Sequence, residues 1–257
     1  MSVFKSLILA FSIFSRIPMP KAEWNQKNMR YLLACFPLVG AAIGLLLMGW
    51  GKFAVSVKLS RMLFACGLTL IPIAVTGGIH MDGLCATANA LTSHAAPEKK
   101  SELLEQKNVS SFSVISLVCY LLLYFSLCYE IVLSNRSLVL LICIHVVSRI
   151  LCAFSVAMLP SDDNSSALSA FAESAAKTAV YAALAVMLFA CEVTALAISP
   201  LGGCLILLNG AVCFLLLKRM AQNDFKGLHG SMIGFFLQMN ELVSVACIII
   251  SQKANFI

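Results

Sequence analysis

Residues 76–91 read TGGIHMDGLCATANAL and place His80 and Asp82 at the end of a long apolar run. Two glycines precede them and can end that helix. If a helix resumes near Asp82, positions 82, 86 and 89 share one face. Carboxylates on such a face would bind Mg²⁺, a hard cation that bridges phosphate oxygens. The positions hold Asp82, Ala86 and Asn89, so a metal would need further ligands, and a helix cap by Asp82 is the alternative interpretation.

A second acidic candidate, Glu241, lies in the middle of the apolar segment MIGFFLQMNELVSVACIII. A carboxylate at the centre of a membrane helix costs about 2.5–3.5 kcal/mol on insertion scales, so it normally faces a cavity or a partner. Gly234, Gln238 and Glu241 form one stripe along this helix. The stripe could serve a functional site or join helices by hydrogen bonds, and the burial cost favours function.

Three further ionisable residues lie within apolar runs. Arg149 is one turn beyond His145, and it could hold a phosphate or pair with a glutamate. Both interpretations of Arg149 remain open. Glu130 and Glu192 are weaker candidates, because neither has a polar neighbour on its own helical stripe.

The elements that position these residues follow from the composition of the chain. Its 257 residues are 60% hydrophobic and 12% charged, with a mean hydropathy of +0.93, whereas a soluble domain is about 25% charged. Alternating strands of about ten residues, typical of a membrane barrel, are absent. The sequence therefore predicts an all-α, polytopic membrane bundle that forms a single domain over 1–257. Most of the eleven cysteines fall inside apolar runs, where they act as small buried hydrophobes.

Apolar runs of about 20 residues are long enough to cross a membrane as helices. They predict seven spans, at 31–50, 62–79, 110–133, 137–158, 177–198, 200–217 and 232–251. The segment 1–20 has no typical cleavage site. We interpret it as a retained interfacial or re-entrant helix, with a first full span as the alternative.

This topology puts the polar segments 16–30, 80–109, 159–176 and 218–231 on one face. With their flanks they carry eleven lysines and arginines, against five on the other face. The positive-inside rule then places the loop-rich face in the cytoplasm. Basic residues that flank spans contact anionic lipid, and no basic run with interleaved aromatic residues indicates nucleic-acid binding. Whether the chain forms a homo-oligomer is left open by the sequence.

Several segments, in order, resemble the cobalamin synthase family, whose members are adenosylcobinamide-GDP ribazoletransferases. FSIFSRIPMP is similar to the family opening F-x-S-R-I/L-P-x-P, and FPLVGAAIGLLL to FPLVGxxxG. TGGIHMDGLCATANAL resembles TGGxHLDGLADTxDG, and HGSMIGFFLQMNELV resembles TGDxLGAxxELxE. The order and spacing hold over nearly the whole chain.

The resemblance implies a reaction that joins α-ribazole, or its 5′-phosphate, to adenosylcobinamide-GDP and releases GMP, with Mg²⁺ as cofactor. It implies a protein of the bacterial or archaeal cell (inner) membrane, with its active site at the cytoplasmic face. The metal and diphosphate shell is expected at Asp82, Asn89 and Glu241, with His80, Gln238 and Ser231 beside it. Arg149 is expected as a phosphate contact, and His80 and His229 as proton carriers.

The sequence also departs from the family pattern at acidic positions. Five of the seven that the pattern contains are neutral here, at Ala86, Asn89, Gln106, Ser231 and Gln238, while Asp82 and Glu241 are kept. This loss should weaken Mg²⁺ binding. Three interpretations stay open: an active synthase whose metal arrives on the substrate, a paralogue that only binds corrinoid or nucleotide, and a scaffold partner of an active enzyme. A non-catalytic lipid-binding protein and a transporter are the hypotheses from other classes.

Overall fold

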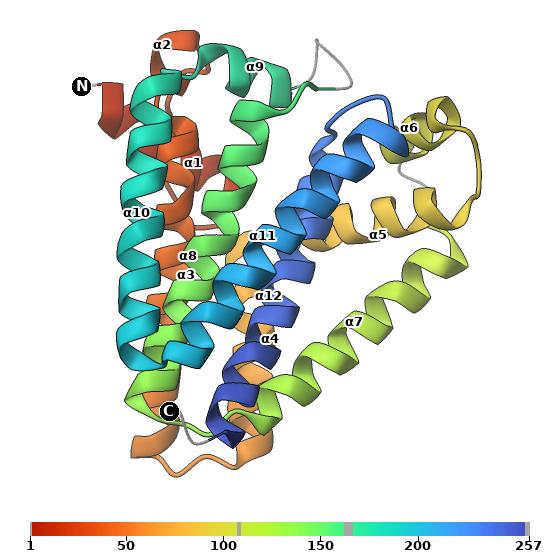
Figure 1. The fold of residues 1–257 in the computed structure, drawn as a ribbon. Coiled ribbons are helices and arrows are strands. Elements are labelled where there is room, and N and C mark those ends of the chain that lie inside the picture. The colour runs from red at the N-terminus through yellow and green to blue at the C-terminus, as the bar shows by residue number, and fades with distance from the viewer. Residues whose placement is uncertain (1, 107–108, 162–166, 255–257) are drawn as a thin grey trace.

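The structure, a computed structural model, describes residues 2–106, 109–161 and 167–254. Twelve helices and no β-strand occur in these residues (Figure 1). The helices are α1 Ser2–Phe14, α2 Gln26–Met29, α3 Leu32–Ser56, α4 Arg61–Thr76, α5 Ile79–Thr92, α6 Pro97–Glu105, α7 Ser111–Glu130, α8 Asn135–Met158, α9 Ala167–Ser174, α10 Lys177–Ile198, α11 Pro200–Asn223 and α12 Gly230–Lys253. The predicted all-α class is therefore confirmed.

Six helices in the described part are long and apolar enough to cross a membrane, and a bent pair, α4 with α5, brings the number to seven. Each predicted span coincides with one of these helices. The run 177–198 matches α10 at both ends, while α3 and α11 extend six residues beyond the predicted limits. The protein is thus a multi-pass membrane protein.

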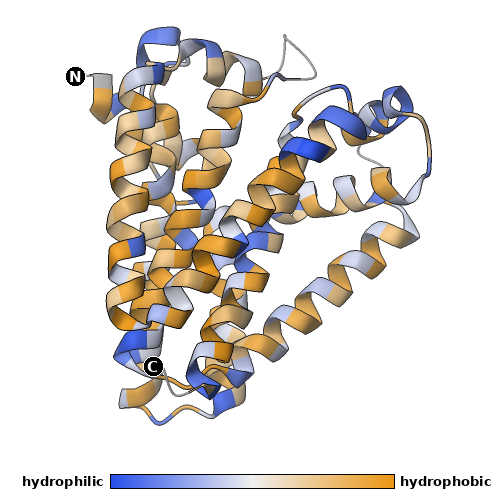
Figure 2. Ribbon diagram, viewed as in Figure 1, coloured by the Kyte–Doolittle hydropathy of each residue, from blue (hydrophilic) through white to orange (hydrophobic). Residues whose placement is uncertain are grey.

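Figure 2 shows apolar residues along the long helices and hydrophilic residues at their ends. The segments predicted to share one face do gather at one end of the bundle, where α2, α6 and α9 lie (Figure 1). Hydrogen bonds link them, from the backbone N–H of Ala176 to the carbonyl of Arg30 and from that of Leu228 to the carbonyl of Pro160. We call this end the polar end.

A close contact between α3 and α8 forms the centre of the bundle. Gly40 and Gly44 lie four residues apart on α3, in the spacing that lets membrane helices approach closely. A methyl group at Gly40 would overlap the backbone carbonyl of His145, and one at Gly44 would lie 2.6 Å from the Cα of Ile142. Both glycines are therefore needed for the observed packing.

At the end of the predicted second span, the chain bends by 92° between α4 and α5. Gly77 and Gly78, with φ of 64° and 78°, occupy the left-handed region at the bend, which glycine adopts at little cost. The backbone N–H of Arg16 donates to the carbonyl of Val75 at 2.7 Å, and its side chain packs over Gly77. The bend turns α5 away from the direction of α4.

The N-terminal helix α1 has 13 residues, fewer than the ~20 that cross a bilayer. The alternative that it is a full span is therefore wrong. Leu9 and Ala10 are fully buried, and α1 packs on α3. Ser6 Oγ donates to the carbonyl of Asn28 at 2.6 Å and accepts from the N–H of Tyr31, so the helix is fixed to the start of the bundle.

Candidate functional site

The segment 76–91 meets the start of α12. The two helices cross where each presents a glycine: a Cβ on Gly83 would lie 2.6 Å from the carbonyl oxygen of Ser231, and a Cβ on Gly234 would lie 3.0 Å from that of His80. Because only glycine permits this approach, the sequence brings Ser231 and His80 onto one site although they are far apart in the chain.

A cavity of about 360 Å³ opens beside this crossing. Its polar lining comes from His80 and Asp82 of α5 and from His229 and Ser231 at the start of α12. His229 is the N-cap of α12, and its Nδ1 accepts a hydrogen bond of 3.2 Å from the N–H of Ser231. The volume falls in the range of ordinary ligand sites, about 300–1,000 Å³.

His80 is the most unusual of these polar residues. Its side chain is buried, with 5% of the residue exposed, and within the described residues its Nε2 has no hydrogen-bond partner. Buried polar atoms are nearly always paired, so an exception indicates a partner that is supplied from outside.

Asp82 lies in the first turn of α5, and Asn89 lies two turns further along the same helix. The N-cap of α5 is Gly78, not Asp82, so the interpretation of Asp82 as a helix cap is wrong. Asp82 is exposed and Asn89 is half-buried. The carboxylate of Asp82 is therefore available to a ligand, and it lies at the positive end of the helix dipole.

The aromatic side chains of α1, α3 and α9 form the apolar wall of the cavity. The rings of Phe14 and Phe36 are 4.2 Å apart, and Phe171 lies 6.2 Å from both Phe14 and Trp24. Sequence analysis did not select these residues, because aromatic side chains in an apolar chain carry no distinguishing signal before the helices are placed.

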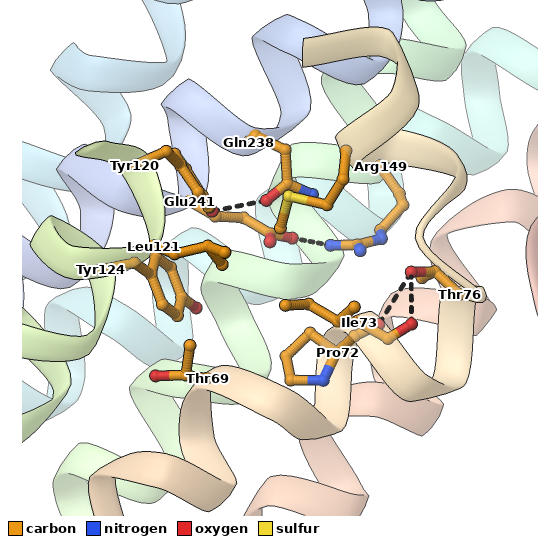
Figure 3. Close-up of a pocket in the computed structure, with 11 residues that line it drawn as sticks. Thr69, Pro72, Ile73, Thr76, Tyr120, Leu121, Tyr124, Arg149, Gln238 and Glu241 are labelled. Atoms are coloured by element: carbon orange, nitrogen blue, oxygen red, sulfur yellow. Dashed lines mark hydrogen bonds and ion pairs between the residues drawn. The ribbon is translucent and has the colours of Figure 1, made fainter. Parts of the chain in front are cut away.

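Glu241 lines a different and much smaller cavity, of about 10 Å³, between α4, α7, α8 and α12 (Figure 3). Its carboxylate pairs with the guanidinium of Arg149, and both side chains are 1% exposed. His145 Nδ1 lies 2.7 Å from the same carboxylate oxygen, and Ser148 donates to it at 3.0 Å. A space of this size holds about one water molecule, so it leaves no room for a diphosphate.

The structure thus places the predicted site residues in two cavities, except Asn89, which lines neither of them. His80, Asp82 and Ser231 line the large cavity, whereas Gln238, Glu241 and Arg149 line the small one. Of the two interpretations of Arg149, pairing with a glutamate is the one observed.

Sequence analysis missed two side-chain partners of Gln238 and Glu241. The hydroxyl of Tyr120 donates to Gln238, and His145 contacts Glu241. The spacing of His145 and Arg149, one turn apart in an apolar helix, is the signal that could have indicated a shared partner.

A comparison with known protein families identifies the family of this chain. The family model described as Cobalamin-5-phosphate synthase matches residues 6–249. The chain belongs to this family. Both segments that build the large cavity, the signature 76–91 and the start of α12, lie within the matched residues.

Several cobalamin-5-phosphate synthase relatives carry the name adenosylcobinamide-GDP ribazoletransferase. The protein of Lachnoclostridium phytofermentans is 33% identical over 247 residues, which is 96% of this chain and 94% of the relative. That of Clostridium perfringens (strain ATCC 13124) is 28% identical over 244 residues, and that of Geobacillus kaustophilus is 28% identical over 241 residues. These alignments cover 94% and 92% of this chain, and 96% and 92% of the relatives. No solved structure matches the chain.

Proposed function

We propose that this protein joins α-ribazole, or its 5′-phosphate, to adenosylcobinamide-GDP and releases GMP, the step that completes the nucleotide loop of a cobalamin. Membership of the family and the names of its relatives support this activity. The observation that carries the site is His80, which lines the large cavity together with Asp82 and whose buried Nε2 has no hydrogen-bond partner among the described residues.

In the proposed reaction, a ribazole hydroxyl oxygen forms a bond to the phosphorus nearer the cobinamide. The bond from that phosphorus to the GMP oxygen breaks, and GMP leaves with the electron pair. His80 Nε2 accepts the proton of the hydroxyl, as a general base in hydrogen-bonding reach of its substrate does. The aromatic wall formed by Phe14, Phe36 and Phe171 packs against a ring of the substrate.

Mg²⁺ is part of this proposal. The protein side chains near the cavity fit this ion only if the substrate diphosphate supplies some of its ligands. No group of three His, Cys, Asp or Glu side chains occurs in the part of the chain that the structure describes. Mg²⁺ is commonly held by one or two carboxylates together with water and substrate phosphates. Asp82, with Asn89 on the same face of α5, would hold an ion that the diphosphate brings, and such an ion neutralises charge on the leaving phosphate.

Glu241 does not belong to this shell in our proposal. Its carboxylate would have to leave Arg149, and a buried guanidinium without a counter-ion costs about 3–5 kcal/mol. Arg149 is likewise not proposed as a phosphate contact, because its guanidinium is already paired. Gln238 accepts a hydrogen bond from Tyr120 in the same small cavity. These three residues hold α8, α7 and α12 together beneath the site.

We place the polar end in the cytoplasm and the protein in the inner membrane of a bacterial cell. The excess of lysines and arginines at this end supports the orientation. The proposed substrates are charged and would reach the cavity from this side. The relatives described above are bacterial proteins.

The proposal is tested with purified protein in liposomes that receives adenosylcobinamide-GDP, α-ribazole and Mg²⁺. We expect GMP release that depends on both substrates and on Mg²⁺. His80→Gln should lower kcat at least tenfold, since general-base catalysis contributes about 10²–10⁴-fold. Asp82→Ala should raise the Mg²⁺ concentration needed for half-maximal rate.

Glu98→Ala is the matched control, because Glu98 is an exposed carboxylate in the first turn of α6. It should leave GMP release unchanged. Corrinoid binding without GMP release by the unmodified protein would overturn the transferase proposal and leave a binding function. Unchanged activity in His80→Gln would remove His80 from the mechanism.

A further inference from the structure

A groove of about 360 Å³ lies at the end of the bundle opposite the polar end, where α3 leads into α4 and α7 leads into α8 (Figure 1). It is open to the surroundings, and part of its surface is polar. Its apolar walls are Ala54, Val55, Leu59, Phe64, Ile131, Val132 and Leu133. Lys58 and Arg61 are the only polar side chains among the described residues that line it. We call it the basic groove.

Neither positive charge of the basic groove has a counter-ion. Lys58 and Arg61 form no ion pair with a carboxylate of the described residues, and the carboxylate of Glu130 pairs with Lys253 instead. Arg61 is held by neutral groups, since its Nε and Nη2 donate to the backbone carbonyls of Tyr129 and Glu130. Its guanidinium also lies 5.1 Å from the centre of the Tyr129 ring. The guanidinium is thus fixed in place, and its Nη1 remains available as a donor.

Lys58 occupies a backbone position that usually belongs to glycine. Its φ is 53°, and its N–H donates to the carbonyl of Val55 at 3.2 Å. The next N–H, of Leu59, donates to the carbonyl of Ala54 at 2.9 Å. These are the two hydrogen bonds of a Schellman motif, in which this position is most often glycine and sometimes asparagine. A lysine there is strained, and strained residues cluster at ligand sites.

The outside of the basic groove faces lipid. Val55, Met62 and Val132 are 60–65% exposed in a chain whose long helices cross a membrane. A ligand that fits both the walls and the charges therefore combines an apolar portion with a negative group. Phosphate oxygens are suited to the charges, because they accept short, charge-assisted hydrogen bonds from arginine and lysine.

We infer that the basic groove binds an anionic glycerophospholipid, with its phosphate on Lys58 and Arg61 and the start of an acyl chain against the apolar walls. A zwitterionic phospholipid is a poorer ligand, because its ammonium adds a positive charge to a site that already has two. Each basic residue near a membrane surface favours anionic lipid roughly fivefold. This inference does not depend on the proposed transferase activity.

The test measures the quenching of Trp50 fluorescence by phospholipids with bromine in the middle of an acyl chain. Trp50 and Lys58 are eight residues apart along one stripe of α3, and the indole N–H of Trp50 donates to the carbonyl of Phe64, a wall residue, at 3.0 Å. At ~1.5 Å per residue, Trp50 lies roughly 9 Å before the end of α3, a depth that such bromine atoms reach. Trp24→Phe makes Trp50 the single tryptophan of the chain, and all variants are made in this background.

Liposomes of a zwitterionic lipid receive the protein and a small, equal mole fraction of brominated phosphatidylglycerol or brominated phosphatidylcholine. Phosphatidylglycerol should quench Trp50 with a relative affinity at least fivefold higher. Lys58→Asn should lower this preference about fivefold, and adding Arg61→Gln should abolish it. Since asparagine suits the left-handed position, Lys58→Asn should not lower the unfolding temperature in detergent, so a lost preference cannot be attributed to a lost fold.

Lys52→Gln with Arg136→Gln is the matched control. Both residues are exposed, lie near the same end of the bundle and do not line the groove. The pair removes the same total charge as the groove variants, and it should keep the preference for phosphatidylglycerol.

Three results would overturn the inference. Equal quenching by the two brominated lipids would show that the groove does not select an anionic lipid. An equal loss of preference in the groove variants and in the control pair would assign the effect to general surface charge. Loss of the preference when inorganic phosphate replaces chloride at constant ionic strength would show that the groove binds a free anion rather than a lipid.

Discussion

Arg149 of α8 and Glu241 of α12 form an ion pair at the centre of the bundle, and each side chain is 1% exposed. His145 and Ser148 contact the same carboxylate oxygen. The pair explains how one membrane-spanning helix can carry a positive charge and another a negative charge, because each charged group is the partner of the other.

Removing one partner of this pair should destabilise the protein more than removing both. Arg149→Met or Glu241→Gln alone leaves an unpaired polar or charged group, at a cost of about 3–5 kcal/mol. The double variant should recover much of the loss in a thermal unfolding experiment in detergent. Glu130→Gln is the control, since Glu130 pairs with Lys253 on the surface at 3.3 Å, and surface pairs contribute about 0–1 kcal/mol.

The same double variant separates a structural role of Glu241 from a metal-binding one. If Glu241 only balances Arg149, the double variant should keep the Mg²⁺ concentration for half-maximal GMP release. A large rise in that concentration, in folded protein, would return Glu241 to the metal shell.

Gly40→Ala should weaken the contact between α3 and α8. The added methyl group would overlap the carbonyl of His145, and overpacking of this kind costs about 1–3 kcal/mol. We expect a lower unfolding temperature in detergent. Gly49→Ala, on the same helix with open space around it, should leave that temperature within error, and an equal loss in both would contradict the packing role of Gly40.

Gly77→Ala should disturb the bend more than Gly78→Ala. Both positions have φ in the left-handed region, which costs a non-glycine residue roughly 1–2 kcal/mol. Only at Gly77 would a Cβ also meet the side chain of Arg16, with Cγ at 2.7 Å. GMP release should therefore fall further in Gly77→Ala, and a larger fall in Gly78→Ala would show that Arg16 does not fix the bend.

Phe171→Ala should weaken substrate binding without lowering the rate at saturation. Phe171 packs against Phe14 and Trp24 on the apolar wall of the large cavity, away from the polar group of His80 and Asp82. We expect KM for α-ribazole or for adenosylcobinamide-GDP to rise several-fold with kcat within twofold. Phe189→Ala, on an exposed face of α10, is the control.

The helices could be predicted well from the sequence because span length and apolar composition are local properties. The bend at Gly77 and Gly78 could be predicted for the same reason. The grouping of the site residues in space could not be predicted from the sequence, because it depends on which faces of the helices contact one another. Gln238 and Glu241 share a stripe of α12 that faces α7 and α8, while Ser231 at its start faces α5. Family motifs give the order of such residues along the chain but not their partners.

The bend also sets the depth of the site. At ~1.5 Å per residue, the 16 residues of α4 span roughly 24 Å, short of the ~30 Å of a typical hydrocarbon core. The membrane must thin locally, or the start of α5 must lie below its surface. Either arrangement brings Asp82, at the start of α5, closer to the opposite surface of the membrane than the end of a full-length span would be.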